Sequence, residues 1–279
     1  MNKRIEVLIC TKDRWSELAL CLQSLSTQTY QDFDVMILDD ASGNPILNCN
    51  FLQRIFQHLK IQGHRVIIFR NDMSVGVCFA RNRLNTEYLK MSDNEYSCRI
   101  DDDVVLNPDY LSKLVGVIDS GFDIASGVTP LIGVPEWKRE SKFVSPIINR
   151  HELDKEGNLI AMNDDCGYSY LDEKILPTHQ FRSCALFKRA VVENIKYEEN
   201  LSFVGFREEG FYSFRSLIKG YKIGVNTNAI AWHFAAPSGG TRSPEYQVNV
   251  TNDNNIFLDW SKRMFLKHGN FLEFANWRA

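Results

Sequence analysis

The stretch RIDDDVV, residues 99–105, places three consecutive carboxylates where a short apolar run, 96–100, ends. Adjacent like charges repel, so a folded domain rarely gathers them at a strand end unless a cation, usually a divalent metal, neutralises them. A solvated acidic turn ahead of Asn107 and Pro108 is the alternative interpretation. The triplet therefore predicts a metal site, which the rest of the chain has to support.

The composition is that of an ordinary globular protein. The 279 residues are 44% hydrophobic and 24% charged, which is enough chain for one large α/β domain or two small ones. Because 32 basic residues nearly balance 35 acidic ones, no extended nucleic-acid surface is expected. No apolar stretch has the length of a signal sequence or transmembrane segment. Seven scattered cysteines without a C-x-x-C pair are typical of free thiols in a reducing compartment, so we expect a cytoplasmic location, with peripheral membrane attachment left open.

Strand-like and helix-like segments alternate through the first half of the chain. Short runs rich in β-branched residues predict strands at 5–10, 33–38, 66–69, 96–100 and 122–125. Segments with helical spacing lie between them at 18–25, 51–59 and 77–88. This order predicts a doubly wound, mostly parallel sheet with helices on both faces. Later apolar runs predict strands at 181–187, 223–225 and 229–233 and a helix over 255–268.

Polar residues follow four of the predicted strands. The carboxyl ends of parallel strands lie along one edge of the sheet, where ligands bind. The four polar segments are 11–14, 39–42, 70–82 and 101–103. Each one alone is explained by helix capping or a turn. Together they predict a nucleotide pocket at one sheet edge.

In this order and at these spacings, the four segments resemble the nucleotide-sugar half of family-two glycosyltransferases, which have the GT-A fold. The segment STQTYQDFD, residues 26–34, is similar to the end of that family's first helix and the entry to its second strand. The resemblance covers about residues 3 to 234. It implies a GT-A domain over 1–234, divided into a nucleotide-sugar-binding half, 1–128, and an acceptor-binding and catalytic half, 129–234. A C-terminal loop and helix extension, 235–279, follows.

The resemblance implies a role for the residues after the first two strands. Thr11 and Arg14 match positions beside the base of the nucleotide. Asp40 matches the carboxylate that accepts a hydrogen bond from the uracil imide, with Ser42 next to it. The implied donor is therefore a nucleotide sugar, and a UDP-sugar is expected.

The resemblance also assigns the third and fourth segments. Gly76 and Arg81 match the segment near the base and diphosphate, where a small residue lets backbone approach and a guanidinium can bind oxygens. Asp101 and Asp103 match the ends of the D-x-D motif. Asp103 would bind the metal directly, while Asp101 or Asp102 would contact the ribose or metal-bound water. Asp101 is also counted among the expected metal residues, and the sequence leaves open which of Asp101 and Asp102 contacts the ribose.

The catalytic residues are expected in FREEGFYSFR, residues 206–215, which matches the family's E-D motif with Glu209 in place of the usual Asp. The resemblance implies that Glu209 is the general base, taking the acceptor's proton as its hydroxyl attacks the anomeric carbon with inversion. Glu208 would position the start of the loop or helix. Two acids that complement a helix dipole are the alternative interpretation of the pair.

His233 matches the position where many members of the family end a strand with a metal-ligating histidine. Carboxylates with one imidazole suit Mn²⁺, with Mg²⁺ as a substitute. Such an ion would neutralise charge on the departing diphosphate.

The second half is expected to bind the acceptor, which could be a glycan, a lipid-linked saccharide or a protein, as in polysaccharide biosynthesis. Its loop-rich region, 130–180, holds aromatic residues and a histidine that could line the acceptor pocket: Trp137, Tyr168, Tyr170 and His179. The segment 237–244 could close over the donor, with Arg242 reaching a diphosphate. The C-terminal helix would pack on the domain or on a partner subunit, so a homo-oligomer is possible.

Three alternatives remain from the sequence. Asp101 and Asp103 also fit the D-x-D-x-[TV] loop of haloacid-dehalogenase-type phosphatases, although that loop normally follows an early strand. The stretch GGTR, residues 239–242, resembles part of the glycine-rich loop of sugar nucleotidyltransferases, which should follow the first strand. A non-catalytic carbohydrate-binding relative would lose the base or the metal ligands, yet Glu209, Asp103 and His233 are present.

Overall fold

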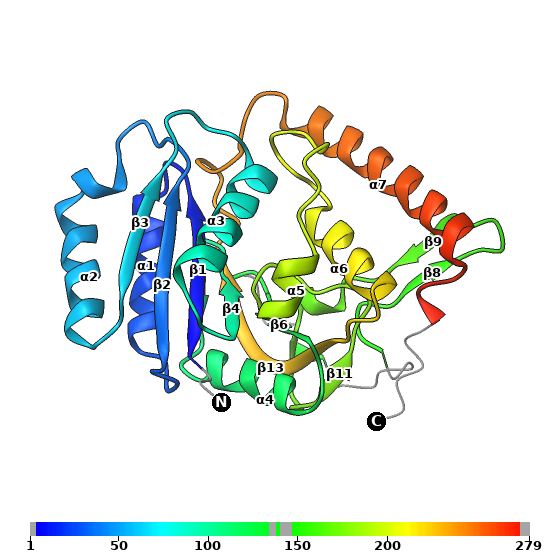
Figure 1. The fold of residues 1–279 in the computed structure, drawn as a ribbon, viewed down its shortest axis with the longest axis horizontal. Coiled ribbons are helices and arrows are strands. Elements are labelled where there is room, and N and C mark those ends of the chain that lie inside the picture. Colours follow the sequence, from blue (N-terminus) through cyan, green and yellow to red (C-terminus); the bar gives the residue numbers. More distant parts are fainter. Residues whose placement is uncertain (1–3, 134–137, 140–146, 274–279) are drawn as a thin grey trace.

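A computed structural model describes residues 4–133, 138–139 and 147–273. Its central sheet begins with four parallel strands in the order β3-β2-β1-β4. Helices connect successive strands, which confirms the predicted parallel, doubly wound half (Figure 1). The elements of this half are β1 (Ile5–Thr11), α1 (Trp15–Ser26), β2 (Phe33–Asp39), α2 (Asn50–Ile61), β3 (Val66–Arg70), α3 (Val77–Met91) and β4 (Tyr96–Arg99).

The second half of the chain continues the same sheet beyond β4. β12 lies antiparallel between β4 and β6, β13 is parallel to β6, and β11 is antiparallel to β13. The short strand β5, directly after the acidic triplet, pairs with the end of β13. The bounds are β5 (Val104–Leu106), β6 (Ile124–Val128), β11 (Ile175–Pro177), β12 (Ala185–Lys188) and β13 (Ile223–His233). Through this pairing, the end of β13 lies beside the residues that follow β4.

The remaining helices cover this sheet, and the remaining strands form two separate two-stranded sheets, β7 with β10 and β8 with β9. α7 lies along α6 in the upper right of Figure 1, and the rings of Phe257 and Trp260 in α7 pack on Phe211 of α6. The expected packing of the C-terminal helix on the domain is thus confirmed. The other bounds are α4 (Tyr110–Asp119), α5 (Arg189–Asn194), α6 (Glu208–Ile218), α7 (Tyr246–His268), β7 (Lys138–Arg139), β8 (His151–Leu153), β9 (Leu159–Met162), β10 (Ser169–Tyr170), and the 3-10 turns Ile46–Asn48 and Asp165–Gly167.

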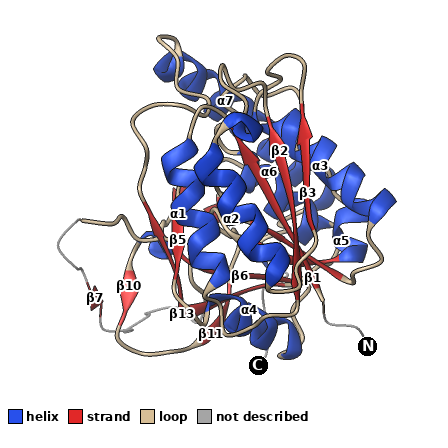
Figure 2. Cartoon of the chain, turned by 90° about the vertical axis from the view of Figure 1, so that its left-hand side faces the viewer, coloured by secondary structure: helices blue, strands red, loops and turns tan. Residues whose placement is uncertain are grey.

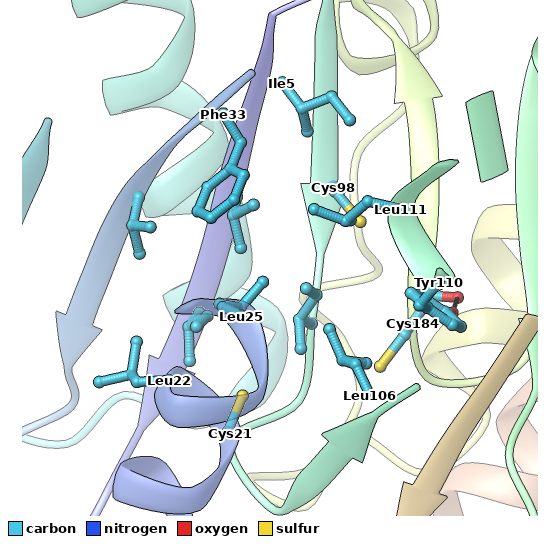
Figure 3. Packing of buried hydrophobic residues seen from close by; sticks show 14 of the residues in the cluster. Ile5, Cys21, Leu22, Leu25, Phe33, Cys98, Leu106, Tyr110, Leu111 and Cys184 are labelled. Atoms are coloured by element: carbon cyan, nitrogen blue, oxygen red, sulfur yellow. Dashed lines mark hydrogen bonds between the residues drawn. The ribbon is translucent and has the colours of Figure 1, made fainter. Parts of the chain in front are cut away.

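The core is divided into two layers by the sheet, because successive side chains of a strand point to opposite faces. On β1, Ile5, Val7 and Ile9 pack with α1, α2 and α4, whereas Leu8 packs with α3, α5, α6 and α7. Figure 2 shows α1 and α2 on one side of the strands and α3 on the other. Figure 3 shows the first layer, where buried cysteines fill space between leucines as small apolar groups. Burial of each such leucine side chain contributes about 1.5 to 3 kcal/mol to the stability of the folded protein.

Some predicted element boundaries were wrong, for identifiable physical reasons. The strand expected at 181–187 begins only at Ala185, because Ser183 has a positive φ of 47°. The two strands expected at 223–225 and 229–233 form one strand, β13, with an irregular register between Val225 and Ile230. There Asn226 and Thr227 bond to the loop before β11 instead of forming a turn.

Further differences concern residues with weak local signals. β6 runs from Ile124 to Val128 rather than over 122–125, and α7 begins at Tyr246, nine residues before the predicted start at position 255. The first turns of α7 are polar and largely exposed, so they carry little apolar periodicity. Among the helices in the described ranges, none combines the length and apolar character that a membrane crossing requires.

Candidate functional site

A cavity of about 310 Å³ opens at the carboxyl ends of β1 and β4 and reaches the start of α6. It gathers most of the residues that the sequence singled out, namely Thr11, Arg14, Asp40, Arg81, Asp101, Asp102, Asp103, Glu208, Glu209 and His233. Ser42 and Gly76 lie outside its lining. The topology therefore brings the four polar segments of the first half together with the acidic pair of the second half.

Asp102, the middle member of the triplet, points toward the loop after β1. Its carboxylate accepts a hydrogen bond from Thr11 Oγ1 at 2.7 Å and one from Arg14 Nη1 at 2.9 Å. Burial raises the pKa of Asp102 to about 6, and the Arg14 guanidinium offsets only part of this effect. Asp102 thus fixes the loop after β1 against the triplet. Thr11 and Arg14 line the cavity and also bond to the Asp102 carboxylate.

Asp103 lies beside His233, because β5–β13 pairing places Val104 opposite His233. His233 Nε2 is 3.3 Å from Asp103 Oδ1, and the backbone N–H of Ala236 donates to Oδ2 at 3.2 Å. Burial opposes both charges, yet the contact lowers the pKa of Asp103 and raises that of His233. Arg14 Nη1 also lies 3.2 Å from Asp103 Oδ2.

Asp101, the first member of the triplet, is the most open of the three carboxylates, with 20% of its side chain exposed. Arg81 of α3 donates to it at 2.9 Å and also pairs with Glu208. Burial works against this charge, but the guanidinium groups of Arg81 and Arg99 hold the pKa of Asp101 below its usual range. Arg81 therefore connects the triplet to the first turn of α6.

Arg99 joins the triplet's strand to the two glutamates of α6. Its guanidinium lies 3.2 Å from Glu208 Oε2 and 2.6 Å from Glu209 Oε1, and it packs over the ring of Phe181. The backbone N–H of Ser183 also donates to Glu209 Oε1, at 2.7 Å. Glu209 Oε2 makes no hydrogen bond with the described residues, and 21% of this side chain is exposed. One carboxylate oxygen of Glu209 is thus held, while the other is open to the cavity.

The described side chains offer few ligands for a metal ion. Across 4–133, 138–139 and 147–273, no group of three or more His, Cys, Asp and Glu side chains is placed to hold an ion. Asp103 and His233 do present an oxygen and a nitrogen to each other. Because Mg²⁺ and similar ions often use one or two protein ligands plus water and substrate phosphates, this pair fits a site completed by a substrate.

Asp40, Ser42 and Gly76 shape the loops behind the cavity. Asp40 lines the cavity, but its oxygens accept bonds from Ser74 Oγ at 2.7 Å and from the backbone N–H of Gly76 at 3.2 Å. Ser42 Oγ accepts a bond from the backbone N–H of Asp13. A Cβ on Gly76 would lie 2.8 Å from the carbonyl oxygen of Phe203, so the close approach at this glycine is made by the second half of the chain.

The aromatic residues and histidine expected at the acceptor pocket are placed elsewhere. Tyr168 and Tyr170 belong to a small apolar cluster, and neither lines the cavity. His179 is buried against His151, while the next residue, Gln180, does line the cavity. Trp137 lies outside the described residues.

The segment after β13 covers the β1 loop. The backbone N–H of Gly240 donates to the carbonyl of Lys12, and Arg14 Nε donates to the carbonyl of Ser238. Arg242 lines the cavity with its guanidinium 4.4 Å from the centroid of the Tyr246 ring. These contacts agree with the expectation that the segment lies over the donor side of the cavity.

The sequence interpretation missed four features of the cavity lining. They are Arg99, Gln180, the turn at 202–207, and Tyr197, whose ring lies under the guanidinium groups of Arg81 and Arg99. Arg99 carried a usable signal, because an arginine in an otherwise apolar buried strand requires buried acids nearby. Gln180 and the turn carry no comparable pattern.

The family model for glycosyl transferase family 2 matches residues 6–196. The chain belongs to glycosyl transferase family 2. The match confirms the resemblance stated from the sequence, and it identifies a glycosyltransferase domain that includes all four polar segments, the acidic triplet among them.

Solved structures share the fold of this family-2 domain. S. aureus TarS has a TM-score of 0.58 at 15% identity, covering 91% of this chain and 39% of that chain. S. aureus TarS 1-349 in complex with UDP-GlcNAc has a TM-score of 0.55 at 14% identity, covering 94% and 73%. GalNAc-T7 with UDP, GalNAc and Mn²⁺ has a TM-score of 0.68 at 15% identity, covering 99% and 55%. The predicted GT-A fold is confirmed, and the chain spans 39% and 55% of the lengths of TarS and GalNAc-T7.

Proposed function

We propose that this family-2 domain transfers a sugar from a nucleotide sugar, with a UDP-sugar as donor, to an acceptor hydroxyl, in a metal-dependent reaction with inversion. The observation that supports this most strongly is the single cavity that joins Asp103 and His233 to Glu209. Complexes of TarS with UDP and UDP-GlcNAc, and of GalNAc-T7 with UDP, GalNAc and Mn²⁺, support the choice of donor and ion. Family membership favours the transferase over the phosphatase and nucleotidyltransferase alternatives.

The donor would bind along the carboxyl ends of β1, β2 and β4. Thr11 and Arg14 would lie beside the base, with Asp40 oriented by the loop at 71–76 that it holds. Ser42 and Gly76 would act through the shape of these loops, since neither reaches the cavity. Arg81 would face the diphosphate side. There Asp101 or Asp102 would contact the ribose or metal-bound water, with Asp101 the more exposed of the two and Asp102 bonded to Thr11 and Arg14.

Asp103 and His233 would hold Mn²⁺ or Mg²⁺. When bound, the ion supplies positive charge to the departing diphosphate, an effect worth several kcal/mol in metal-assisted reactions. Arg14 contacts Asp103 Oδ2, whereas His233 contacts Oδ1. Asp103 Oδ1, which lies beside His233, would therefore bind the ion together with the imidazole, while Oδ2 keeps its contact with Arg14.

Glu209 is the proposed general base. Arg99 and the Ser183 N–H fix Oε1 and thereby aim Oε2, which would take the proton as the acceptor hydroxyl attacks the anomeric carbon. The glycosidic bond forms as the bond to the diphosphate breaks, so no covalent enzyme intermediate is required. Glu208 is enclosed by Arg81 and Arg99, which suits a positioning role.

Thermal unfolding with a panel of nucleotide sugars, with and without Mn²⁺, tests this proposal, because a ligand that binds the folded state raises its stability. We expect one UDP-sugar to raise Tm in a manganese-dependent way. Asp103→Ala should remove the manganese-dependent part, whereas Glu209→Gln should keep it and lose turnover by a factor of about 100 or more, on the order of general-base contributions.

Asp109→Ala and Glu87→Gln are matched controls, since both acids lie on the surface in lysine pairs. Neither should change the manganese response or the turnover. Near-normal transfer by Glu209→Gln would remove the base assignment, and unchanged metal dependence in Asp103→Ala would remove the metal site. The glycan, lipid-linked saccharide or protein acceptor, the cytoplasmic location and a homo-oligomer through the C-terminal helix stay predictions.

A further inference from the structure

Most cations that line the cavity are neutralised by carboxylates. Arg14 pairs with Asp102, and Arg81 and Arg99 pair with Glu208. Within the described part of the chain, the lining arginines Arg207 and Arg242 form no ion pair.

The two arginines belong to different segments of the chain. Arg242 belongs to the segment that covers the β1 loop and stacks on Tyr246, so it is on the donor side. Arg207 directly precedes Glu208 at the start of α6, and its Nε donates to the neutral side chain of Asn254 in α7 at 2.9 Å. Burial lowers the pKa of Arg207, and the more distant Asp164 and Glu209 offset this only in part. Both terminal nitrogens of Arg207 are left without a carboxylate partner among the described residues.

The backbone at Arg207 is held in an unusual conformation. Its φ of 71° and ψ of 9° are left-handed, which long side chains rarely adopt. The fully buried Asp253 of α7 secures the turn by accepting bonds from the backbone N–H groups of Ser202 and Phe206, at 2.7 and 2.8 Å. Strain of this kind persists where the surrounding structure enforces it, and it clusters at ligand-binding sites. The turn therefore presents the Arg207 side chain from a preset position.

The position of Arg207 indicates which substrate it would meet. It lines the cavity two residues before Glu209, the proposed base, and its guanidinium lies 4.7 Å from the centroid of the Phe206 ring. Because Arg81 and Arg99 already neutralise Glu208 and Glu209, Arg207 adds a positive charge that no carboxylate of the described residues cancels, and this charge attracts an anion. A guanidinium with two open nitrogens matches the two oxygens of a carboxylate or phosphate.

We propose that Arg207 binds an anionic group, a phosphate or a carboxylate, on the sugar acceptor, so that this domain glycosylates an anionic saccharide. This inference rests on the proposed function, because the proposed base Glu209 defines which side of the cavity receives the acceptor. It assigns Arg207 to recognition of the acceptor, leaving donor binding to the residues of the first half and Arg242.

Isothermal titration at constant ionic strength tests this assignment, using the full chain saturated with UDP and Mn²⁺ so that the donor side is occupied. The probes are glucose, glucose 6-phosphate and glucuronate. We expect at least one charged sugar to bind about tenfold or more tightly than glucose, on the scale of charge-assisted hydrogen bonds. Arg207→Gln should remove this preference, and Arg207→Lys should retain part of it.

Arg54→Gln is the matched control, because Arg54 is an exposed arginine of α2 outside the cavity lining, and it should keep the full preference. The UDP Kd of Arg207→Gln should stay within about twofold of the wild-type value. Equal or undetectable binding of all three sugars, or a preference that survives in Arg207→Gln, would overturn the proposal. A large loss of UDP affinity in Arg207→Gln would also overturn it, by assigning Arg207 to the donor.

The two proposals fail in different ways. A wild-type protein that binds no UDP-sugar contradicts the proposed function, while the sugar titrations without UDP still decide whether Arg207 binds anions. A protein that binds UDP with manganese but shows no charge preference contradicts only the assignment of Arg207.

Discussion

At the scale of single residues, Arg99 stabilises the candidate site by connecting its two acidic groups. Its side chain is 6% exposed and contacts both Glu208 and Glu209, from which it is separated by 109 and 110 positions in the chain. Removing one partner of a buried ion pair leaves an unpaired charge, which costs far more than the loss of a surface pair.

Arg99→Gln is therefore expected to lower the free energy of unfolding by about 3 to 5 kcal/mol, which urea denaturation at pH 7 would measure. Arg150→Gln is the control, because Arg150 forms an exposed pair with Glu152 and should change stability by less than about 1 kcal/mol. Equal stability of the two variants would show that Arg99 is not an essential partner of the α6 acids.

The residues that could be predicted from sequence were those in contiguous motifs. The triplet, Thr11, Arg14, Arg81 and Glu209 all line the cavity, as their motif positions implied. Arg99, whose partners are far away in the chain, could not be paired before the fold was known.

At the scale of elements, the start of α3 depends on a close contact between the two halves. Gly76 precedes the helix with a φ of 85°, and the backbone N–H of Val77 donates to the carbonyl of Phe203. A side chain at this position meets both a strained backbone and the atoms of Phe203.

Gly76→Ala is expected to destabilise the protein by about 2 kcal/mol or more, because it combines a clash with the strain of a backbone conformation, φ 85° and ψ 169°, that is essentially restricted to glycine. Gly63→Ala separates the two effects, since Gly63 has a φ of 97° but a Cβ added there would meet no atom within 4 Å. Its cost should be about 1 kcal/mol. Thermal unfolding of both variants checks the difference, and a smaller cost for Gly76→Ala than for Gly63→Ala would contradict the packing argument.

Elements with strong apolar periodicity were predictable, and those set by tertiary contacts were not. The strands β1 to β4 are buried or partly buried runs whose composition is sufficient to identify them. β13 was predicted as two strands, because the polar residues at 226–228 look like a turn until their bonds to the loop before β11 are known. The early part of α7 was missed because its pattern is polar.

At the scale of the whole molecule, two buried histidines make stability depend on pH. His151 and His179 contact each other beside β8, and burial lowers the pKa of each from 6.5 to about 4. The unfolded chain therefore binds more protons than the folded one between pH 6.5 and 4. Their contribution to stability is complete above pH 6.5 and is lost as the pH falls through this window.

Each histidine accounts for about 3 kcal/mol over that range. Asp102 titrates there in the opposite sense, because its raised pKa of about 6 favours the folded state as the pH falls, so a variant must isolate the histidine effect. His179→Asn should gain about 3 kcal/mol relative to the wild type between pH 7 and 4, measured by urea denaturation. His58→Asn, which replaces an exposed histidine of α2 by the same residue type, is the matched control. A constant difference between His179→Asn and the wild type would refute the assignment.

The place of β13 in the sheet has a consequence for biosynthesis. This strand is translated long after the triplet, yet its last residue lies directly beside Asp103. Because a nascent chain emerges amino end first, the early half leaves the ribosome without the imidazole of the proposed cation site. The proposed manganese site could therefore form only after residue 233 has been translated, and a product truncated before β13 would lack His233, one of the two side chains proposed to hold the ion.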